Sequence, residues 1–267
     1  MKPKHLLKLI ALLVVVAALG YFFPYVAGIL VVCGLYDLLR NRKLDVGKFV
    51  QYFTGNGILT WLLSPFNTLL DLISLPFVNK GIYRLEDLPP GHRAEVQRLI
   101  DSAHQQNLVG RMEEIVKERS RTMIFWKWYG ADVPAVVEIP AFHEKYKYIK
   151  TIGLSVFNKK KSTSRHFGPF RATLRVLYNI NTVTDPNAYI EVGDTIHRWC
   201  ENKLFIFDDT LMHQSFNETD QARYCLFVDI LRPSPFALLL ASIVSTTRFF
   251  LKSVNFIFYK NWDVVKQ

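Results

Sequence analysis

Hydrophobic and polar residues divide the chain into two apolar ends and a middle of mixed composition. No residue between positions 9 and 36 is charged. As one helix, these roughly 28 residues would be about 42 Å long, which exceeds the roughly 30 Å hydrocarbon core of a bilayer. Pro24 interrupts the run, and basic residues flank it on both sides. The pattern predicts a membrane hairpin over residues 1–45, with one long kinked span as the alternative.

A second apolar stretch, residues 51–78, carries a single charge, that of Asp71. Within it, apolar and polar residues fall on opposite helical faces. The apolar face consists of Phe66, Leu69, Leu70 and Ile73, and the polar face of Asn67, Asp71 and Ser74. We interpret residues 46–85 as a helical segment that lies in the membrane surface. A core helix of the main domain is an equally weighted alternative.

The C-terminal residues 236–267 repeat this pattern. An apolar stripe at helical spacing is formed by Phe236, Leu240, Ile243, Phe250, Val254 and Phe258. The opposite side carries Ser245, Arg248, Lys252 and Asn255. Basic residues on the polar face of an amphipathic helix suit an anionic bilayer, so we expect a membrane-associated tail.

The middle of the chain, residues 86–235, has a different pattern. After the turn at Pro89-Pro90-Gly91, residues 92–105 have the periodicity of an exposed helix. Short β-rich runs follow at 151–157, 172–180, 188–192, 195–199, 204–207 and 224–230. Short strands at this spacing are typical of a sandwich or barrel. We expect an α+β fold with a double-stranded β-helix (jelly roll) core, N-terminal membrane helices and amphipathic flanking helices.

Composition narrows the class of protein. Hydrophobic residues make up 50% and charged residues 21%, which excludes a disordered or fibrous chain. The net charge of +10 favours anionic partners. No nucleic-acid motif accompanies it, so a lipid bilayer is the expected partner and nucleic acid is not. Three scattered cysteines favour a reducing compartment over a disulfide framework. The oligomeric state is left open.

Two histidine-containing motifs carry the candidate chemistry. His166 and His213 each lie beside a predicted strand, from which imidazoles can converge in a barrel mouth. Imidazole suits iron, zinc, copper and nickel. Two distant histidines alone are a weak metal signal, and a structural histidine is the alternative for each. Arg175 and Arg223 lie within apolar strands, with surface ion pairs as the alternative for both.

The spacing of these residues resembles the aspartyl/asparaginyl β-hydroxylase family of iron- and 2-oxoglutarate-dependent oxygenases. That family has a His-x-Gly-Pro stretch with an Arg nine residues after the His, and a Phe-Asp-Asp-x-x-x-His stretch with an Arg ten residues after its His. The matching residues are His166, Gly168, Pro169, Arg175, Phe207, Asp208, Asp209, His213 and Arg223, with Trp199 between the two stretches. The resemblance covers residues 155–233. The family includes membrane-bound bacterial enzymes that hydroxylate acyl chains of lipid A or ornithine lipids.

The resemblance implies a set of site residues. His166 and His213 would be the protein ligands of Fe(II), and O₂ would bind at an open position of the iron. The usual carboxylate ligand would stand at Gly168, and family members without it let water take its place. Asp209 would bind that water, with direct ligation of the metal as the alternative. For the cosubstrate 2-oxoglutarate, Arg223 would bind the distal carboxylate together with Ser155.

Arg175 would lie near the iron, toward the keto-acid end. Two details depart from the family pattern. Leu177 replaces a second histidine that is common two residues after Arg175, so one polar contact to the cosubstrate is lost or replaced. The loop with Lys159, Lys160 and Lys161 lacks a Pro-Gly turn. These lysines would meet a phosphate or carboxylate headgroup, or would form a solvated turn.

The sequence therefore predicts a membrane-bound Fe(II)/2-oxoglutarate-dependent dioxygenase that hydroxylates an acyl chain of a membrane lipid. We expect it in a bacterial inner membrane, with the catalytic domain facing the cytoplasm, where 2-oxoglutarate and reduced iron are found. Three alternatives remain open. They are hydroxylation of Asp or Asn in a protein, a catalytically inactive membrane-tethered binding domain, and halogenation at an iron without a carboxylate ligand.

Overall fold

A computed structural model describes residues 10, 14, 17–18, 20–117, 119–251 and 262–265 of the chain. The helices are α2 (Pro24–Leu39), α3 (Val46–Thr54), α4 (Ile58–Leu62), α5 (Ser64–Ile73), α6 (Pro90–Gln105), α7 (Leu108–Val116) and α8 (Ala237–Leu251), with 3-10 turns at Leu85–Asp87 and Pro140–His143. The strands are β1 (Ile82–Tyr83), β2 (Arg121–Trp128), β3 (Ala131–Asp132), β4 (Ile149–Phe157), β5 (Lys161–Ser162), β6 (Thr173–Asn179), β7 (Ala188–Val192), β8 (Thr195–Arg198), β9 (Leu204–Phe207), β10 (His213–Asn217), β11 (Arg223–Leu231) and β12 (Asp263–Val264).

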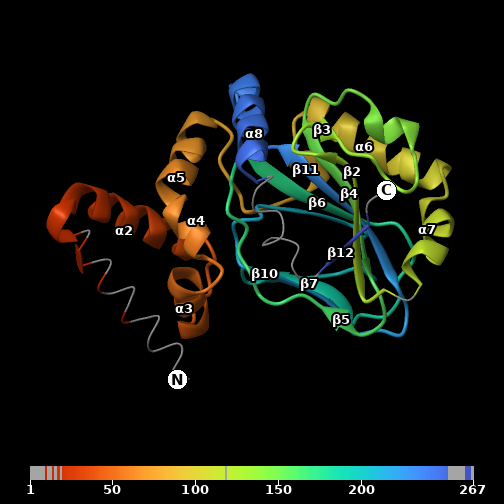
Figure 1. The fold of residues 1–267 in the computed structure, drawn as a ribbon, viewed down its shortest axis with the longest axis horizontal. Helices are drawn as coiled ribbons and strands as arrows, with labels where there is room; N and C mark the ends of the chain where they lie inside the picture. The colour runs from red at the N-terminus through yellow and green to blue at the C-terminus, as the bar shows by residue number, and fades with distance from the viewer. Residues whose placement is uncertain are drawn as a thin grey trace.

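The strands form two sheets. The larger has the order β1-β9-β6-β11-β4-β2-β12, with β3 beside β2, and the smaller has the order β5-β10-β7-β8. Neighbouring strands are antiparallel except β12 and β2, which are parallel. Figure 1 shows α6 and α7 on one side of the sheets and α2 to α5 on the opposite side. The six β-rich runs of the sequence correspond to β4, β6, β7, β8, β9 and β11.

Alternation along the central strands separates the core from the site. On β4, Ile152, Leu154 and Val156 join the main hydrophobic core with α6 and α7. Ser155 therefore faces the other way, into the space between the sheets, because successive side chains point to opposite faces. On β11, the same rule places Arg223, Cys225, Phe227 and Asp229 on one face. The sheet thus presents a polar row to the interior of the barrel.

The prediction of N-terminal membrane helices, and with it that part of the expected fold class, is wrong. Among the described residues, no helix is both long enough and apolar enough to cross a membrane. Helix α2 begins at Pro24, a favoured first helical residue, and has 16 residues, or about 24 Å. Its C-terminal end is part of the domain, since Asp37 and Leu38 are buried. The predicted hairpin also includes residues that lie outside the described ranges.

A buried charge network docks the N-terminal helices. The guanidinium of Arg171 is fully buried and meets Asp37 of α2 at 2.5 Å and Asp71 of α5 at 2.7 Å. Asp208, which follows β9, lies 3.4 Å from Arg171 and 2.6 Å from Arg40. Burial alone would raise the pKa of Asp208, but the two arginines outweigh it and hold that pKa below its ordinary value. The charges are therefore compensated inside the protein.

Helix α5 is oriented with its polar face inward. Asn67 and Ser74 are fully buried, and Asp71 pairs with Arg171 and Arg232. Its apolar residues Leu69 and Leu72 are exposed, although Leu70 is buried. Helix α5 therefore contacts the domain through polar residues and through Leu70, with Phe66 and Ile73 packed beside it.

Helix α8 divides the predicted C-terminal stripe. Leu240 is buried in one cluster with Leu70, and Ile243 packs against that cluster, while Phe236 and Phe250 are exposed. The remaining stripe residues Val254 and Phe258, and the polar Lys252 and Asn255, lie outside the described residues.

Replacing Arg171 with methionine should lower the free energy of unfolding by about 3–5 kcal/mol, because Asp37 loses the cation that compensates its buried charge. Urea unfolding followed by circular dichroism measures this. The control is Lys160→Met, which removes an exposed ion pair with Asp220 and should cost less than about 1 kcal/mol. Equal stability of the two variants would contradict the structural role of Arg171.

Candidate active site

His166 and His213 lie side by side at the mouth of the barrel. Their backbones form an antiparallel bridge, with His166 N donating to His213 O at 3.0 Å and His213 N donating to His166 O at 2.9 Å. The two ring centroids are 4.1 Å apart. His213 opens β10, and His166 belongs to the loop before β6. The structure thus brings together two residues that are distant in the sequence.

Both imidazoles are held as neutral bases. Each Nδ1 bonds a backbone carbonyl, that of Ser164 at 2.7 Å for His166 and that of Leu211 at 2.9 Å for His213. A carbonyl can only accept, so Nδ1 carries the proton and Nε2 is left with a lone pair. Burial lowers the pKa of both rings, and that of His213 lies well below its ordinary value. Neutral imidazole is the form that binds metal ions.

Asp209 takes up the space beside Gly168. A Cβ on Gly168 would lie 2.1 Å from Asp209 Oδ2 and 2.7 Å from the Asp209 carbonyl oxygen. The backbones also pair, with Gly168 N donating to that carbonyl at 2.8 Å. No side chain fits at position 168 while the 209 turn stands where it does. The Asp209 carboxylate thus occupies the space that a side chain at position 168 would need.

The carboxylate of Asp209 is aimed at the histidines. Its Oδ1 lies 3.3 Å from His213 Nε2 and is buried without a hydrogen-bond partner among the described residues. Its Oδ2 pairs with Arg175 Nη2 at 3.2 Å. An orphaned carboxylate oxygen beside two imidazole lone pairs fits a metal ion or a metal-bound water. Within the described residues, however, no three His, Cys, Asp or Glu side chains are grouped as a preassembled metal centre.

Arg175 links this carboxylate to the sheet. It lies opposite Asp229 in the β6–β11 register, and its Nε meets Asp229 Oδ1 at 2.7 Å. Its guanidinium carbon lies 3.8 Å from the centre of the Phe227 ring. Burial raises the pKa of Asp229, although Arg175 acts against this. Arg175 lines both cavities that His166 lines, and its partner Asp229 is a residue that the motif did not indicate.

Arg223 ends a separate, narrow cavity of about 60 Å³, which we call the Arg223 cavity. The guanidinium is 1% exposed, and its Nη2 donates to Ser215 Oγ at 2.9 Å. Its Nε and Nη1 have no partner among the described residues. Ser155 lines the same cavity, as do both histidines. A buried cation with two free donors, beside a hydroxyl, fits a carboxylate ligand.

A wider, apolar cavity of about 150 Å³ adjoins the histidine pair, and we call it the Trp128 cavity. Five aromatic side chains line it: Trp128, Tyr129, Phe167, Phe227 and Trp262. Asp209, Gly168 and His166 line it as well. It shares His166, Arg175 and Phe227 with the Arg223 cavity, so the two cavities meet at His166.

The N-terminal helices support the loop that carries His166. Asn56 Nδ2 donates to the Arg165 carbonyl at 3.0 Å, and Thr60 Oγ1 donates to the Gly168 carbonyl at 3.0 Å. Asn67 bonds Pro169 O at 3.1 Å and receives a bond from Arg171 N at 3.0 Å. These supporting residues were not identified from the sequence, because helical periodicity does not indicate which loop a polar face contacts.

Two predicted features lie apart from the histidines. Asp208 faces the Arg171 network and not the site, so the two aspartates of the Phe-Asp-Asp stretch have different roles. Lys160 forms an exposed pair with Asp220, and none of Lys159, Lys160 and Lys161 lines either cavity described above. Leu177, at the position of the missing histidine, is buried in the wall of the Arg223 cavity.

Comparison with known proteins identifies the family. The sequence model described as aspartyl/asparaginyl beta-hydroxylase matches residues 93–233, more than half of the chain. The chain belongs to this family. Family membership confirms the resemblance carried by the His, Gly-Pro and Arg spacing. The matched region contains both histidines, Asp209, Arg175 and Arg223.

A similar curated protein is the ornithine lipid ester-linked acyl 2-hydroxylase of Rhizobium tropici. It is 35% identical over 92 residues, which are 34% of this chain and 32% of that protein. The match thus spans about a third of the relative's length.

Solved structures resemble this family member weakly. A prolyl-4-hydroxylase from Pseudomonas putida aligns with 50% of this chain and 87% of its own, at 10% identity and a TM-score of 0.35. A 2OG-Fe(II) oxygenase family oxidoreductase from Burkholderia pseudomallei aligns with 35% of this chain and 48% of its own, at 13% identity and a TM-score of 0.28. Likenesses of this size carry no argument about function.

Gly168→Ala should reduce Fe(II) affinity by at least tenfold, because the new Cβ forces the Asp209 turn away from the histidines. Anaerobic calorimetric titration with Fe(II) measures this. Gly28→Ala is the matched control, because a Cβ there meets nothing within 4 Å. Unchanged Fe(II) affinity in Gly168→Ala would contradict the close packing of position 168 against the 209 turn.

Proposed function

We propose that this protein is an Fe(II)- and 2-oxoglutarate-dependent hydroxylase that acts on an ester-linked acyl chain of a membrane lipid. The observation that carries the proposal is the convergence of two cavities, one cationic and one aromatic, on a pair of neutral histidines. Family membership supports the reaction class. The similarity to an ornithine lipid acyl 2-hydroxylase supports a lipid substrate, oxidised at the carbon next to the ester carbonyl.

His166 and His213 would hold the iron through their Nε2 atoms. Asp209 would reach the same ion directly or through a bound water, since its free oxygen lies 3.3 Å from His213 Nε2. Arg175 fixes the Asp209 carboxylate on its far side, so that the free oxygen stays turned toward the histidines. Bound iron would supply O₂ activation, with 2-oxoglutarate decarboxylated to succinate and one oxygen atom transferred to a C–H bond.

The Arg223 cavity would hold 2-oxoglutarate. Nε and Nη1 of Arg223 would bind its distal carboxylate, and Ser155 lies on the same wall. Arg223 is stacked between Phe157, at 4.4 Å from its ring centre, and Trp199, at 5.0 Å. These rings hold the guanidinium in place and keep water from it, so a carboxylate gains more there than at the surface.

The Trp128 cavity would hold the acyl chain. Five aromatic rings line it, beside the polar side chains of Thr163, His166, Arg175 and Asp209. The lining is more apolar than polar, which supports a hydrocarbon substrate. Arg175 and the buried Nε1 of Trp128 also offer donors to an Asp or Asn side chain, so the reaction products must separate the two substrate classes.

We further propose that the protein works at a bilayer surface. Helix α5 packs Leu70 into the domain together with the polar Asn67, and leaves Leu69 and Leu72 exposed. Helix α8 exposes Phe249 and Phe250. Exposed apolar area of this kind marks an interaction surface, and a lipid substrate makes the bilayer its partner. Co-sedimentation with vesicles tests this, and a protein that stays in the supernatant contradicts it.

The reaction is tested with purified protein, Fe(II), 2-oxoglutarate and vesicles of bacterial lipid. We expect acyl chains that gain the mass of one oxygen atom and an equal amount of succinate. Mass spectrometry of lipids and of added Asp- and Asn-containing peptides from the same reaction separates the two substrate classes. Hydroxylated peptides with unchanged lipids would overturn the lipid assignment, and succinate without either product would overturn both.

Arg223→Met serves as the internal variant of this experiment. It should raise the 2-oxoglutarate concentration for half-maximal rate by about 100-fold, because a paired, buried carboxylate loses its cation. Arg198→Met, at a half-buried arginine of β8 that lines neither cavity, is the matched control. An unchanged 2-oxoglutarate requirement in Arg223→Met would show that this arginine is structural.

A further inference from the structure

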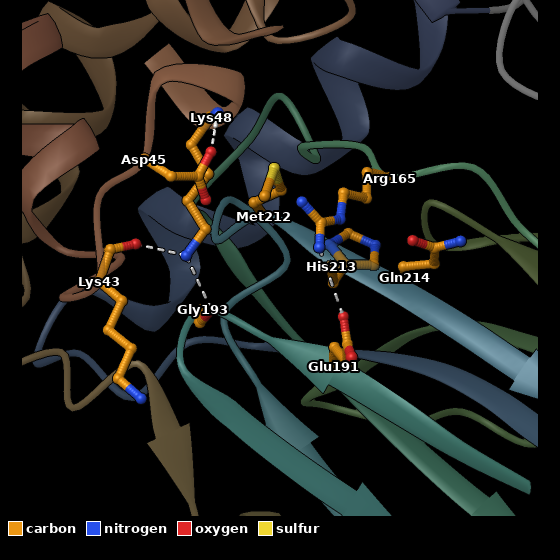
Figure 2. Close-up of a pocket in the computed structure, with 9 residues that line it drawn as sticks. All are labelled: Lys43, Asp45, Lys48, Arg165, Glu191, Gly193, Met212, His213 and Gln214. Atoms are coloured by element: carbon orange, nitrogen blue, oxygen red, sulfur yellow. Dashed lines mark hydrogen bonds and ion pairs between the residues drawn. The ribbon is translucent and has the colours of Figure 1, made fainter. Parts of the chain in front are cut away.

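His213 also lines a third cavity, of about 170 Å³, that the proposed reaction leaves unassigned (Figure 2). We call it the Lys43 cavity. Three cations line it: Lys43, from the segment after α2; Lys48, in the first turns of α3; and Arg165, the residue before His166. Its two carboxylates are those of Asp45 and Glu191.

The cations are only partly compensated by these carboxylates. Lys48 is 6% exposed, and its ammonium donates to the carbonyls of Lys43 and of Gly193, the latter at 3.0 Å. No described carboxylate lies within ion-pair distance of Lys43 or Lys48. Asp45 is occupied as the N-cap of α3, where it accepts from Lys48 N at 2.8 Å. Glu191 meets Arg165 only at 3.9 Å.

The cavity is placed next to the reacting centre. His213 lines both it and the Arg223 cavity, and Arg165, the neighbour of His166 in the chain, lines it as well (Figure 2). A carbon adjacent to an ester carbonyl is only a few bonds from the headgroup of its lipid. Oxidation of that carbon therefore requires the headgroup to lie close to the histidines, while the rest of the chain extends away from them.

We propose that the Lys43 cavity binds an anionic group, a carboxylate or a phosphate, in the headgroup of the lipid substrate. This rests on the proposed function. Lys43 and Arg165 would contact the anion directly, and Lys48 would add a buried positive charge behind them. The exposed lysines of the 159–161 turn, which were the sequence-based candidates for a headgroup, do not line this cavity.

Binding without turnover tests the site. Isothermal calorimetry on the full chain would compare a short-chain N-acyl amino acid with its methyl ester, which lacks the negative charge, and short-chain phosphatidic acid with inorganic phosphate. We expect the acid to bind at least tenfold more tightly than the ester, and phosphatidic acid to bind at least tenfold more tightly than phosphate. A charge-assisted contact is of the size that such a ratio needs.

Lys43→Glu and Arg165→Gln should each reduce the preference for the acid by about tenfold. Lys145→Glu, which makes the same charge change at an exposed lysine distant in sequence from every lining residue, should retain it. Equal binding of acid and ester, or a preference that survives both cavity variants, would overturn the proposal. Equal binding of phosphate and phosphatidic acid would show a site for free anions and would overturn it too.

These outcomes are separate from the failure of the proposed function. A charge preference that depends on Lys43 and Arg165, combined with no hydroxylated lipid, would retain the headgroup site and remove the reaction. If lipid is hydroxylated but the preference for the acid over the ester does not change in Lys43→Glu and Arg165→Gln, the reaction stands and the headgroup site does not.

Discussion

The buried guanidinium of Arg171 is the interaction on which the rest of the structure depends. It lies five residues after His166 and four before Arg175, and its partners come from α2, from α5 and from the turn after β9. That turn continues directly into Asp209 and His213. One cation thus fixes the helices that support the His166 loop and the segment that supplies the second histidine. Full burial makes this arrangement all-or-none, because a carboxylate that loses its cation in such a place cannot be solvated.

Adjacent aspartates divide the work of this turn. Asp208 points into the charge network, where it accepts from Asn79 at 2.6 Å and from Thr210. Asp209 points to the histidines and Arg175. The first carboxylate is saturated with donors and the second keeps one oxygen free, although the two are neighbours in the chain. The contrast explains how a rigid turn can present a single unsatisfied oxygen to a ligand.

The sequence predicted what depends on local pattern. The resemblance to the family pattern identified Ser155, Arg175, Arg223 and both histidines. It could not predict contacts between distant segments, such as Asp229 with Arg175 or Thr60 with the Gly168 carbonyl. The membrane hairpin failed for a related reason. An apolar run in a sequence indicates burial, but it does not distinguish burial in lipid from burial in protein. The contact that attaches this segment to the domain is made by Asp37, the first residue after the run, whose partner Arg171 is distant in the sequence.

The contact between Gly168 and Asp209 has a consequence for engineering the site. An acidic residue introduced at position 168 would collide with the backbone of the 209 turn as well as with the Asp209 side chain. A carboxylate ligand at position 168 and the present path of the 209 turn therefore exclude each other. A redesign that moves the carboxylate to position 168 has to rebuild the 209 loop at the same time.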